Sequence, residues 1–186
     1  MRKKEHKVGV VIPNWNGKKL LAKCLPSLYS QTFNDFCTII IDNNSLDDSI
    51  DFIKKNYPMV KLIKLSQNFG FAKPVNVGIK KLNTEYIFIL NNDTVLEKNC
   101  LKFLIEAAEN KNIAGVTPKV LFMDKPYLIE SVGDYMNVAG QAFHRGFLAK
   151  KEKFNKKEEV FLIPATAALF RKTVFEKIGL FDESFF

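Results

Sequence analysis

Four short apolar runs, each stopped by polar residues or proline, dominate the first hundred positions of the chain. They occupy residues 7–13 (KVGVVIP), 37–42 (CTIIID), 60–65 (VKLIKL) and 85–90 (EYIFIL). Short runs rich in β-branched residues are typical of strands that are buried on both faces of a sheet. Residues 60–65 instead alternate between apolar and polar side chains, so this strand is predicted to be more exposed.

Segments with helical spacing separate these runs. They predict helices over residues 17–31, 45–57, 71–82 and 97–110, and a further strand follows at residues 113–122. Ser45 is the predicted N-cap of the second helix. This alternation of strands and helices predicts an α/β fold with a mostly parallel central sheet and helices on both faces.

The rhythm changes in the last third of the chain. Glycine and aromatic residues between positions 133 and 147 predict hairpins or an irregular connection. The basic stretch 149–159 (AKKEKFNKKEE) is predicted to be an exposed loop or flap. Residues 165–179 return to regular structure, and Gly179 is predicted to end a helix.

Length and composition restrict the class of protein. The chain has 186 residues, of which 47% are hydrophobic and 26% are charged, and this suits one soluble globular domain. No apolar run approaches the roughly 18 residues of a membrane-spanning helix. Cys24, Cys37 and Cys100 are scattered without a CxxC spacing, which predicts free thiols in a reducing compartment. The expected location is cytoplasmic, with at most peripheral contact at the inner face of the membrane.

The net charge of +8 favours anionic partners, such as nucleotides, phosphorylated lipids, an anionic membrane surface or nucleic acid. Much of the excess is local, at residues 2–4 and 150–157. A solvated basic surface explains the same charge equally well. Because the basic residues are not interleaved with aromatic residues on one element, nucleic acid is not an expected partner. The lysines at 150–157 are instead a candidate contact for anionic lipid or a lipid-diphosphate acceptor.

Three of the predicted strands end on polar residues. These ends are Pro13-Asn14-Trp15-Asn16, Asp42-Asn43-Asn44 and Asn91-Asn92-Asp93. In an open parallel sheet the carboxyl ends of the strands share one edge, and ligands bind just outside it. The sequence therefore predicts a ligand site that is built from these three strand ends.

The absence of a glycine-rich phosphate cradle narrows the chemistry of that site. The first strand-to-helix turn has neither GxGxxG nor GxxxxGK[ST], so a bound diphosphate would have to be neutralised by a divalent cation. Mg²⁺ and Mn²⁺ take oxygen ligands and need only one or two carboxylates. Asp93 suits that role, and Asp42 suits hydrogen bonding to a base or ribose hydroxyl. The alternatives are a turn or N-cap role for Asp93, an Asx-turn role for Asp42, and a packing role for Trp15.

Four segments in order resemble the glycosyltransferases of family 2, which have the GT-A fold. They are residues 8–49 (VGVVIPNWNG…NNSLDDS), NFGFAKPVNVGIK, YIFILNNDTVL in the place of the family's D-x-D motif, and GLFDESFF. The LNND form is similar to the rhamnosyltransferase-like branch. The resemblance spans residues 7–186 and implies one GT-A domain over residues 1–186. Its nucleotide-binding half would be residues 1–125, and residues 126–186 would begin an acceptor-side half that is incomplete at its C-terminus.

The resemblance also implies roles for particular residues. The residues expected to bind the nucleotide-sugar are Pro13, Asn14, Asn16, Asp42, Lys73, Asn76, Asn91, Asn92 and Asp93. Asp42 would contact the base or ribose, Lys73 and Asn76 would lie beside the nucleotide or its phosphates, and Asp93 would bind Mn²⁺ or Mg²⁺. Asn91 replaces the usual first acidic residue of the D-x-D motif, so a single carboxylate would serve the cation.

The implied activity is an inverting transfer of a sugar to a saccharide or lipid-linked acceptor in surface polysaccharide synthesis. The donor would be a dTDP- or UDP-linked sugar. In the family, the segment that GLFDESFF resembles runs into an acidic motif that holds the catalytic base, and Asp182 and Glu183 would have a structural part. Because the sequence stops at Phe186, the chain is expected to lack the base and to be weakly active or inactive. The alternative is a nucleotide-sugar-binding fragment or an interaction module. Residues 165–168 would lie on the acceptor side of the sugar pocket, or would serve close packing.

Overall fold

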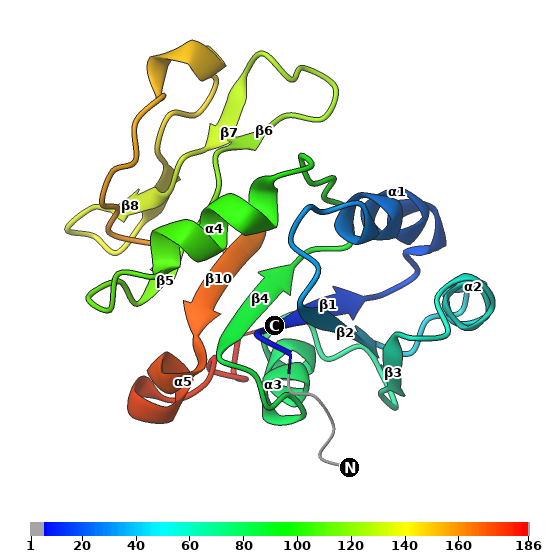
Figure 1. Ribbon diagram of the computed structural model, residues 1–186. Helices are drawn as coiled ribbons and strands as arrows, with labels where there is room; N and C mark the ends of the chain where they lie inside the picture. Colours follow the sequence, from blue (N-terminus) through cyan, green and yellow to red (C-terminus); the bar gives the residue numbers. More distant parts are fainter. Residues whose placement is uncertain (1–5, 186) are drawn as a thin grey trace.

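A six-stranded sheet forms the centre of the computed structural model, which describes residues 6–185 (Figure 1). The strand order is β3-β2-β1-β4-β10-β5. The bounds are β1 Val8–Asn14, β2 Phe36–Asp42, β3 Lys61–Lys64, β4 Tyr86–Leu90, β5 Gly115–Val116 and β10 Ala167–Arg171. The first four strands in this order are parallel, and β10 is antiparallel to both of its neighbours. The predicted mostly parallel sheet is therefore confirmed.

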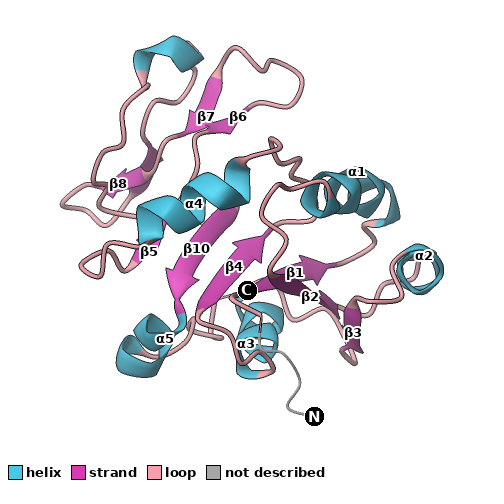
Figure 2. Cartoon of the chain, viewed as in Figure 1, coloured by secondary structure: helices cyan, strands magenta, loops and turns pink. Residues whose placement is uncertain are grey.

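Helices cover both faces of the sheet, as predicted. They are α1 Lys18–Tyr29, α2 Ser49–Asn56, α3 Ala72–Lys80, α4 Cys100–Ala108 and α5 Lys172–Ile178. Along β1, Val10 and Ile12 pack in one core with α1, α2 and α4, whereas Val11 packs with α3 and α5 on the other face. Figure 2 shows this arrangement, with α3 and α5 below the strands and α1 and α4 above them. The alternation within one strand explains why β1 reads as a continuous apolar run.

Two short hairpins stand outside the main sheet. Strands β6 (Val120–Leu121) and β7 (Ile129–Ser131) form one, and β8 (Asp134–Met136) and β9 (Ala142–His144) form the other. The short helix η1 (Lys151–Lys153) follows within the exposed basic stretch. Lys119 holds this stretch in place, because its Nζ donates to the carbonyl oxygens of Lys151 at 2.7 Å and Phe154 at 2.9 Å. The hairpin predicted within residues 133–147 and the exposed basic loop are both present.

Two local predictions are wrong. The single strand expected at residues 113–122 is split into β5 and β6, which belong to different sheets. Pro118 lies between them and has no N–H to donate, so the chain leaves the main sheet there. The second helix begins at Ser49 rather than after a Ser45 cap, because the Ser45 hydroxyl donates to the Asp42 carboxylate instead.

Among the helices of residues 6–185, none combines the length and the apolar character needed to cross a membrane.

Candidate functional site

The three polar strand ends meet at one edge of the sheet, as the sequence predicts. Strands β1 and β2 are in register there, with Asn14 opposite Asp42. Asn14 lies between its neighbours: its Nδ2 donates to Asp42 Oδ2 at 3.0 Å, and its Oδ1 accepts from Asn92 Nδ2 at 2.8 Å. A continuous line of side-chain hydrogen bonds therefore joins the ends of β2, β1 and β4.

Asp42 is the most deeply buried member of this network, with none of its surface exposed. Its Oδ1 accepts the backbone N–H of Ser45 at 2.9 Å, and its Oδ2 accepts the Ser45 hydroxyl at 2.5 Å. These bonds span three residues, one more than the Asx-turn that the sequence left as an alternative. The predicted contact of Asp42 with a base or ribose would require this fully buried carboxylate to become accessible. Ser45, which the sequence predicts to be a helix N-cap, also belongs to this network.

The loop after β1 is shaped by Asn16 and Gly17. Asn16 has a left-handed backbone with φ 49°, its N–H donates to Ser45 Oγ at 2.8 Å, and its Oδ1 accepts from Leu46 N at 2.7 Å. A Cβ on Gly17 would lie 2.3 Å from both Asn14 Oδ1 and Asn92 Nδ2, so only glycine fits. Asn16 is exposed beside this loop.

Two flanking residues differ in exposure. Pro13 is half-buried within β1, opposite Ile41 of β2. Trp15 is 54% exposed, which contradicts the packing alternative for this side chain. The ring is therefore free to contact a ligand or a partner at this edge.

Asp93 lies at the exposed end of β4, and the turn that carries it is fixed by other residues. Asn91 N donates to Thr166 O at 2.9 Å, and Asn91 O accepts the Thr94 hydroxyl at 2.5 Å. Helix α4 begins at Cys100 with Asn99 as its N-cap residue, so the N-cap alternative for Asp93 is wrong. Within residues 6–185 no hydrogen bond reaches the Asp93 carboxylate, which is thus available to a ligand.

The donor set at Asp93 fits a divalent cation of the Mg²⁺ type. No group of three or more His, Cys, Asp or Glu side chains with metal-binding geometry occurs in the described part of the chain. Mg²⁺ keeps several waters and is commonly bound by one or two carboxylates together with substrate phosphates. One exposed carboxylate at the edge of the sheet is compatible with that mode and not with an all-protein cage.

The nearest thiol takes no part in such chemistry. Cys24 on α1 is fully buried and lies beneath the same turn, with its Sγ 3.8 Å from Asn91 O. Burial raises the pKa of Cys24 to about 12, and burial likewise raises the pKa of Cys100 to about 11. Both side chains therefore stay protonated at neutral pH, and the thiolate form that binds metals or attacks substrates is absent. All three cysteines are free, as predicted.

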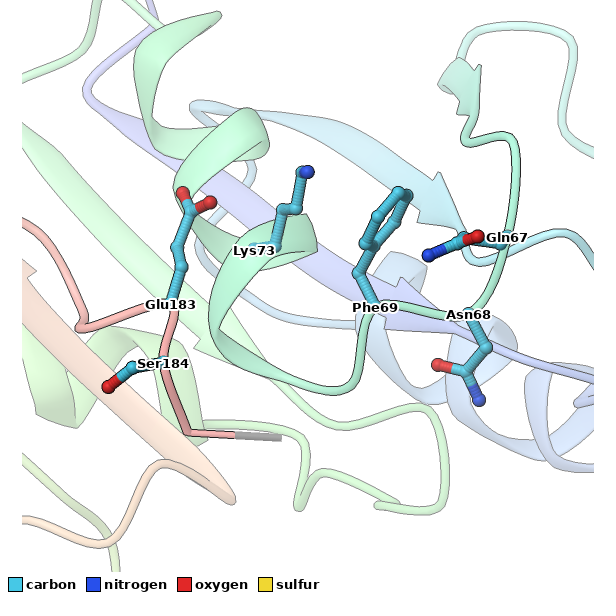
Figure 3. A pocket seen from close by; sticks show the side chains of 6 residues that line it. All are labelled: Gln67, Asn68, Phe69, Lys73, Glu183 and Ser184. Carbon is cyan, nitrogen blue, oxygen red and sulfur yellow. The ribbon is translucent and has the colours of Figure 1, made fainter.

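A cavity of about 300 Å³ lies at the start of α3. It is lined by Gln67, Asn68, Phe69, Lys73, Glu183 and Ser184 (Figure 3). Asn43 connects the end of β2 to this loop, since its Nδ2 donates to Gly70 O at 2.8 Å. The Lys73 ammonium lies over the Phe69 ring, 3.8 Å from the ring centroid. The structure thus places Lys73 in a pocket that adjoins the strand ends.

Asn76 lies on α3 and binds a distant segment of the chain. It is only 2% exposed, and its Nδ2 donates to Phe181 O at 2.8 Å and to Glu183 Oε1 at 3.0 Å. Its Oδ1 accepts Phe181 N at 3.0 Å. Both the N–H₂ group and the oxygen of this amide bind the segment at residues 181–183, so Asn76 holds this segment against α3.

The small residues that follow the basic stretch lie in two different environments. Ala167 and Ala168 lie inside β10 and are 3% and 0% exposed, so they serve close packing. Thr166 is half-buried, and its carbonyl is the group that binds Asn91 N. This connection therefore reaches the strand end that carries Asp93.

Comparison with known proteins identifies the family. Residues 9–179 match the sequence pattern of the family described as Glycosyl transferase family 2. The chain belongs to glycosyltransferase family 2. Among curated relatives of this family member, the poly(ribitol-phosphate) beta-N-acetylglucosaminyltransferase TarP of Staphylococcus aureus strain N315 is 29% identical over 176 residues. The matched region is 92% of this chain and 50% of TarP.

Solved structures confirm the GT-A fold of this family 2 chain. S. aureus TarS 1-349 in complex with UDP matches with a TM-score of 0.70 and 20% identity, over 96% of this chain and 51% of that one. The mannosyltransferase PcManGT from Pyrobaculum calidifontis, in complex with GDP-Man and Mn2+, matches with a TM-score of 0.69 and 16% identity, over 97% and 49%. The chain spans about half the length of the curated relatives it matches.

Proposed function

We propose that this chain is the donor-binding part of an inverting glycosyltransferase. It would take a sugar from a nucleotide-diphosphate sugar for transfer to a saccharide or lipid-linked acceptor of a surface polysaccharide. The observation that carries the proposal is the exposed Asp93 carboxylate next to a buried polar network at the carboxyl edge of the sheet. Membership of family 2 and relatives named for teichoic acid and poly-N-acetylglucosamine synthesis support it.

The residues at the carboxyl edge would have different roles: metal binding, lining of the donor site and support of the strand ends. Asp93 would hold Mn²⁺ or Mg²⁺, which would neutralise the charge of the leaving diphosphate when bound. Pro13, Asn16, Asn91 and Asn92 would line the donor site around it. Asn14 and Asp42 would keep the strand ends in place, because their polar groups already bind one another and Ser45. A prebuilt polar site of this kind needs little rearrangement when a charged ligand arrives.

The favoured donor is a UDP-linked sugar. TarS was solved with UDP and TarP is named for N-acetylglucosaminyl transfer, whereas PcManGT was solved with GDP-Man. A dTDP-linked donor, and with it rhamnosyl transfer, is the second choice and rests on the LNND form of the motif. The difference between these donors lies in the nucleoside, so the nucleotides themselves can test it.

A calorimetric titration with UDP and dTDP, each with Mn²⁺ and with chelator, tests the proposal. We expect metal-dependent binding of UDP that Asp93→Ala weakens by at least about ten-fold, since a charged ligand group is lost. The melting temperature of Asp93→Ala should match that of the wild type, because this exposed carboxylate has no hydrogen-bond partner within residues 6–185. Absence of UDP and dTDP binding in the wild type would sink the proposal.

A binding module without turnover is the second candidate. The observation in its favour is that Glu183, one of the two acids nearest the expected base, is bound by Asn76 against α3. Release of N-acetylglucosamine from UDP-N-acetylglucosamine separates the two candidates. Binding with no release, even with a saccharide acceptor present, would favour the module.

The basic stretch suggests where an acceptor or a membrane would meet the protein. Its five lysines, at 150, 151, 153, 156 and 157, are all exposed. We propose peripheral contact of these lysines with anionic lipid or with a lipid-linked acceptor. Flotation with vesicles that contain about one third phosphatidylglycerol tests this: the wild type should float and a variant with five Lys→Gln changes should not, with pelleting of both as the contrary result.

A further inference from the structure

The pocket at the start of α3 holds two charged side chains to which the proposed function gives no particular partner. Lys73 comes from α3, and Glu183 comes from a segment more than one hundred residues later in the chain. Figure 3 shows the two side chains next to each other, with Phe69 on the far side of Lys73. The pocket is thus formed only when the C-terminal segment lies against α3.

Neither charge is neutralised by the other. No ion pair joins Lys73 to Glu183 among residues 6–185, and the ammonium lies over the Phe69 ring instead. Glu183 Oε1 accepts from Asn76, while its second carboxylate oxygen has no hydrogen-bond partner in the described part of the chain. The pocket therefore offers a donor and an acceptor at adjacent positions, each with capacity for a ligand.

Asn76 sets the position of the acceptor. This side chain is nearly fully buried, and its N–H₂ group and its oxygen both bind Phe181 or Glu183. The ring of Phe181 also packs edge-on against Phe71, with centroids 6.2 Å apart. A buried amide that is bonded through both its N–H₂ group and its oxygen fixes one geometry, because any displacement of the segment would leave polar groups unpaired.

We propose that Glu183 binds the nucleoside part of the donor and that Asn76 is its positioning residue, an inference that rests on the proposed function. A carboxylate accepts hydrogen bonds from N–H and O–H groups and repels phosphate. The group that meets Glu183 is therefore an N–H or O–H donor, and the nucleoside carries both kinds, as a base N–H and as ribose hydroxyls. Lys73 supplies the neighbouring donor for a carbonyl or hydroxyl oxygen of the same nucleoside.

The test compares ligands with and without a nucleoside. UDP, 2′-deoxy-UDP and inorganic pyrophosphate are titrated with Mn²⁺ into the wild type, Glu183→Ala, Asn76→Ala and the double variant. Glu176→Ala, an exposed glutamate on α5, is the matched control. We expect Glu183→Ala to weaken UDP binding about ten-fold and to leave pyrophosphate binding unchanged, because a charge-assisted hydrogen bond is lost. A loss of the same size with 2′-deoxy-UDP identifies the base or the ribose 3′-hydroxyl as the donor group, and no loss identifies the ribose 2′-hydroxyl.

A positioning role for Asn76 predicts a distinct pattern of UDP affinities among the variants. Asn76→Ala should weaken UDP binding less than Glu183→Ala does, and the double variant should be no weaker than Glu183→Ala alone. General loosening of the fold would instead weaken UDP and pyrophosphate equally. Since Glu183 is exposed, its variant folds even if Asn76→Ala does not.

Two results would overturn the inference. Unchanged UDP affinity in Glu183→Ala, with binding that still depends on Mn²⁺ and Asp93, would overturn it and leave the proposed function intact. A wild type that binds no UDP at all would overturn both together.

Discussion

The carboxyl edge of the sheet and the segment at residues 118–164 are held together in opposite ways. At the edge, buried polar groups from three strands bind one another across wide sequence separations, as Asn14 does with Asp42 and Asn92. In the segment, apolar side chains are left exposed: Tyr135 and Phe143 stack across the β8–β9 hairpin and remain 50% and 43% exposed. The edge is a prebuilt site because its polar groups are buried and bonded to one another, whereas the hairpin leaves its stacked side chains exposed.

The two regions also differ in what would be lost when one polar group is removed. A buried acceptor leaves its donors unpaired, whereas an acceptor near the surface can be replaced by water. Matched substitutions at the two places therefore measure the difference directly.

Asp42→Asn is expected to have the largest effect on stability. The new amide N–H₂ would face donors, since both Asp42 oxygens accept hydrogen bonds from Asn14 and Ser45. We expect the free energy of unfolding to fall by about 3 kcal/mol, and the melting temperature by roughly 6–12 °C. The matched change is Asp134→Asn in the hairpin, whose carboxylate is 12% exposed and pairs with the buried Ser131 and the exposed His144.

For Asp134→Asn the expected loss is about 1 kcal/mol, because water can reach the replaced group. Thermal unfolding of both variants, followed by circular dichroism, gives the comparison. Equal losses at the two positions would remove the distinction between the regions.

Much of the fold and the position of the edge follow from local sequence patterns. The buried runs, the helical spacing and the polar strand ends are all short-range signals, and parallel pairing then brings the ends of β1, β2 and β4 together. The contacts that individual site residues make do not follow from such local patterns. The sequence assigned Ser45 to a helix cap and Asn76 to the nucleotide, because it could not show what each side chain meets.

A long-range contact explains the position of Asn76, and a short-range contact explains that of Ser45. Asn76 binds residues 105 and 107 positions later, and no periodicity encodes such a pairing. Ser45 could have capped the helix or bound Asp42. It binds Asp42 because a buried charge without hydrogen bonds is costly. Pro118 did carry a local signal: a proline inside a predicted strand already argues for an edge or a break.

The second comparison separates crowding from backbone strain. Gly17 has an ordinary φ of −110°, but an added Cβ would lie 2.3 Å from each atom of the Asn92–Asn14 hydrogen bond. Gly140, at the hairpin tip, has the reverse situation: φ is 79° and no atom lies within 4 Å of the added Cβ. Gly17→Ala should therefore damage the polar network, and Gly140→Ala should only strain the backbone.

We expect Gly17→Ala to lower the free energy of unfolding by about 2 kcal/mol, as overpacking does, and Gly140→Ala by about 1 kcal/mol. Ligand binding separates the two more sharply than stability. Since Asn92 would be displaced beside Asp93, Gly17→Ala should weaken Mn²⁺-dependent UDP binding about ten-fold, while Gly140→Ala should leave it unchanged. Calorimetry on the two folded variants measures this. Unaltered UDP affinity in Gly17→Ala would mean that the buried network supports the fold of the edge without shaping the site that binds the nucleotide.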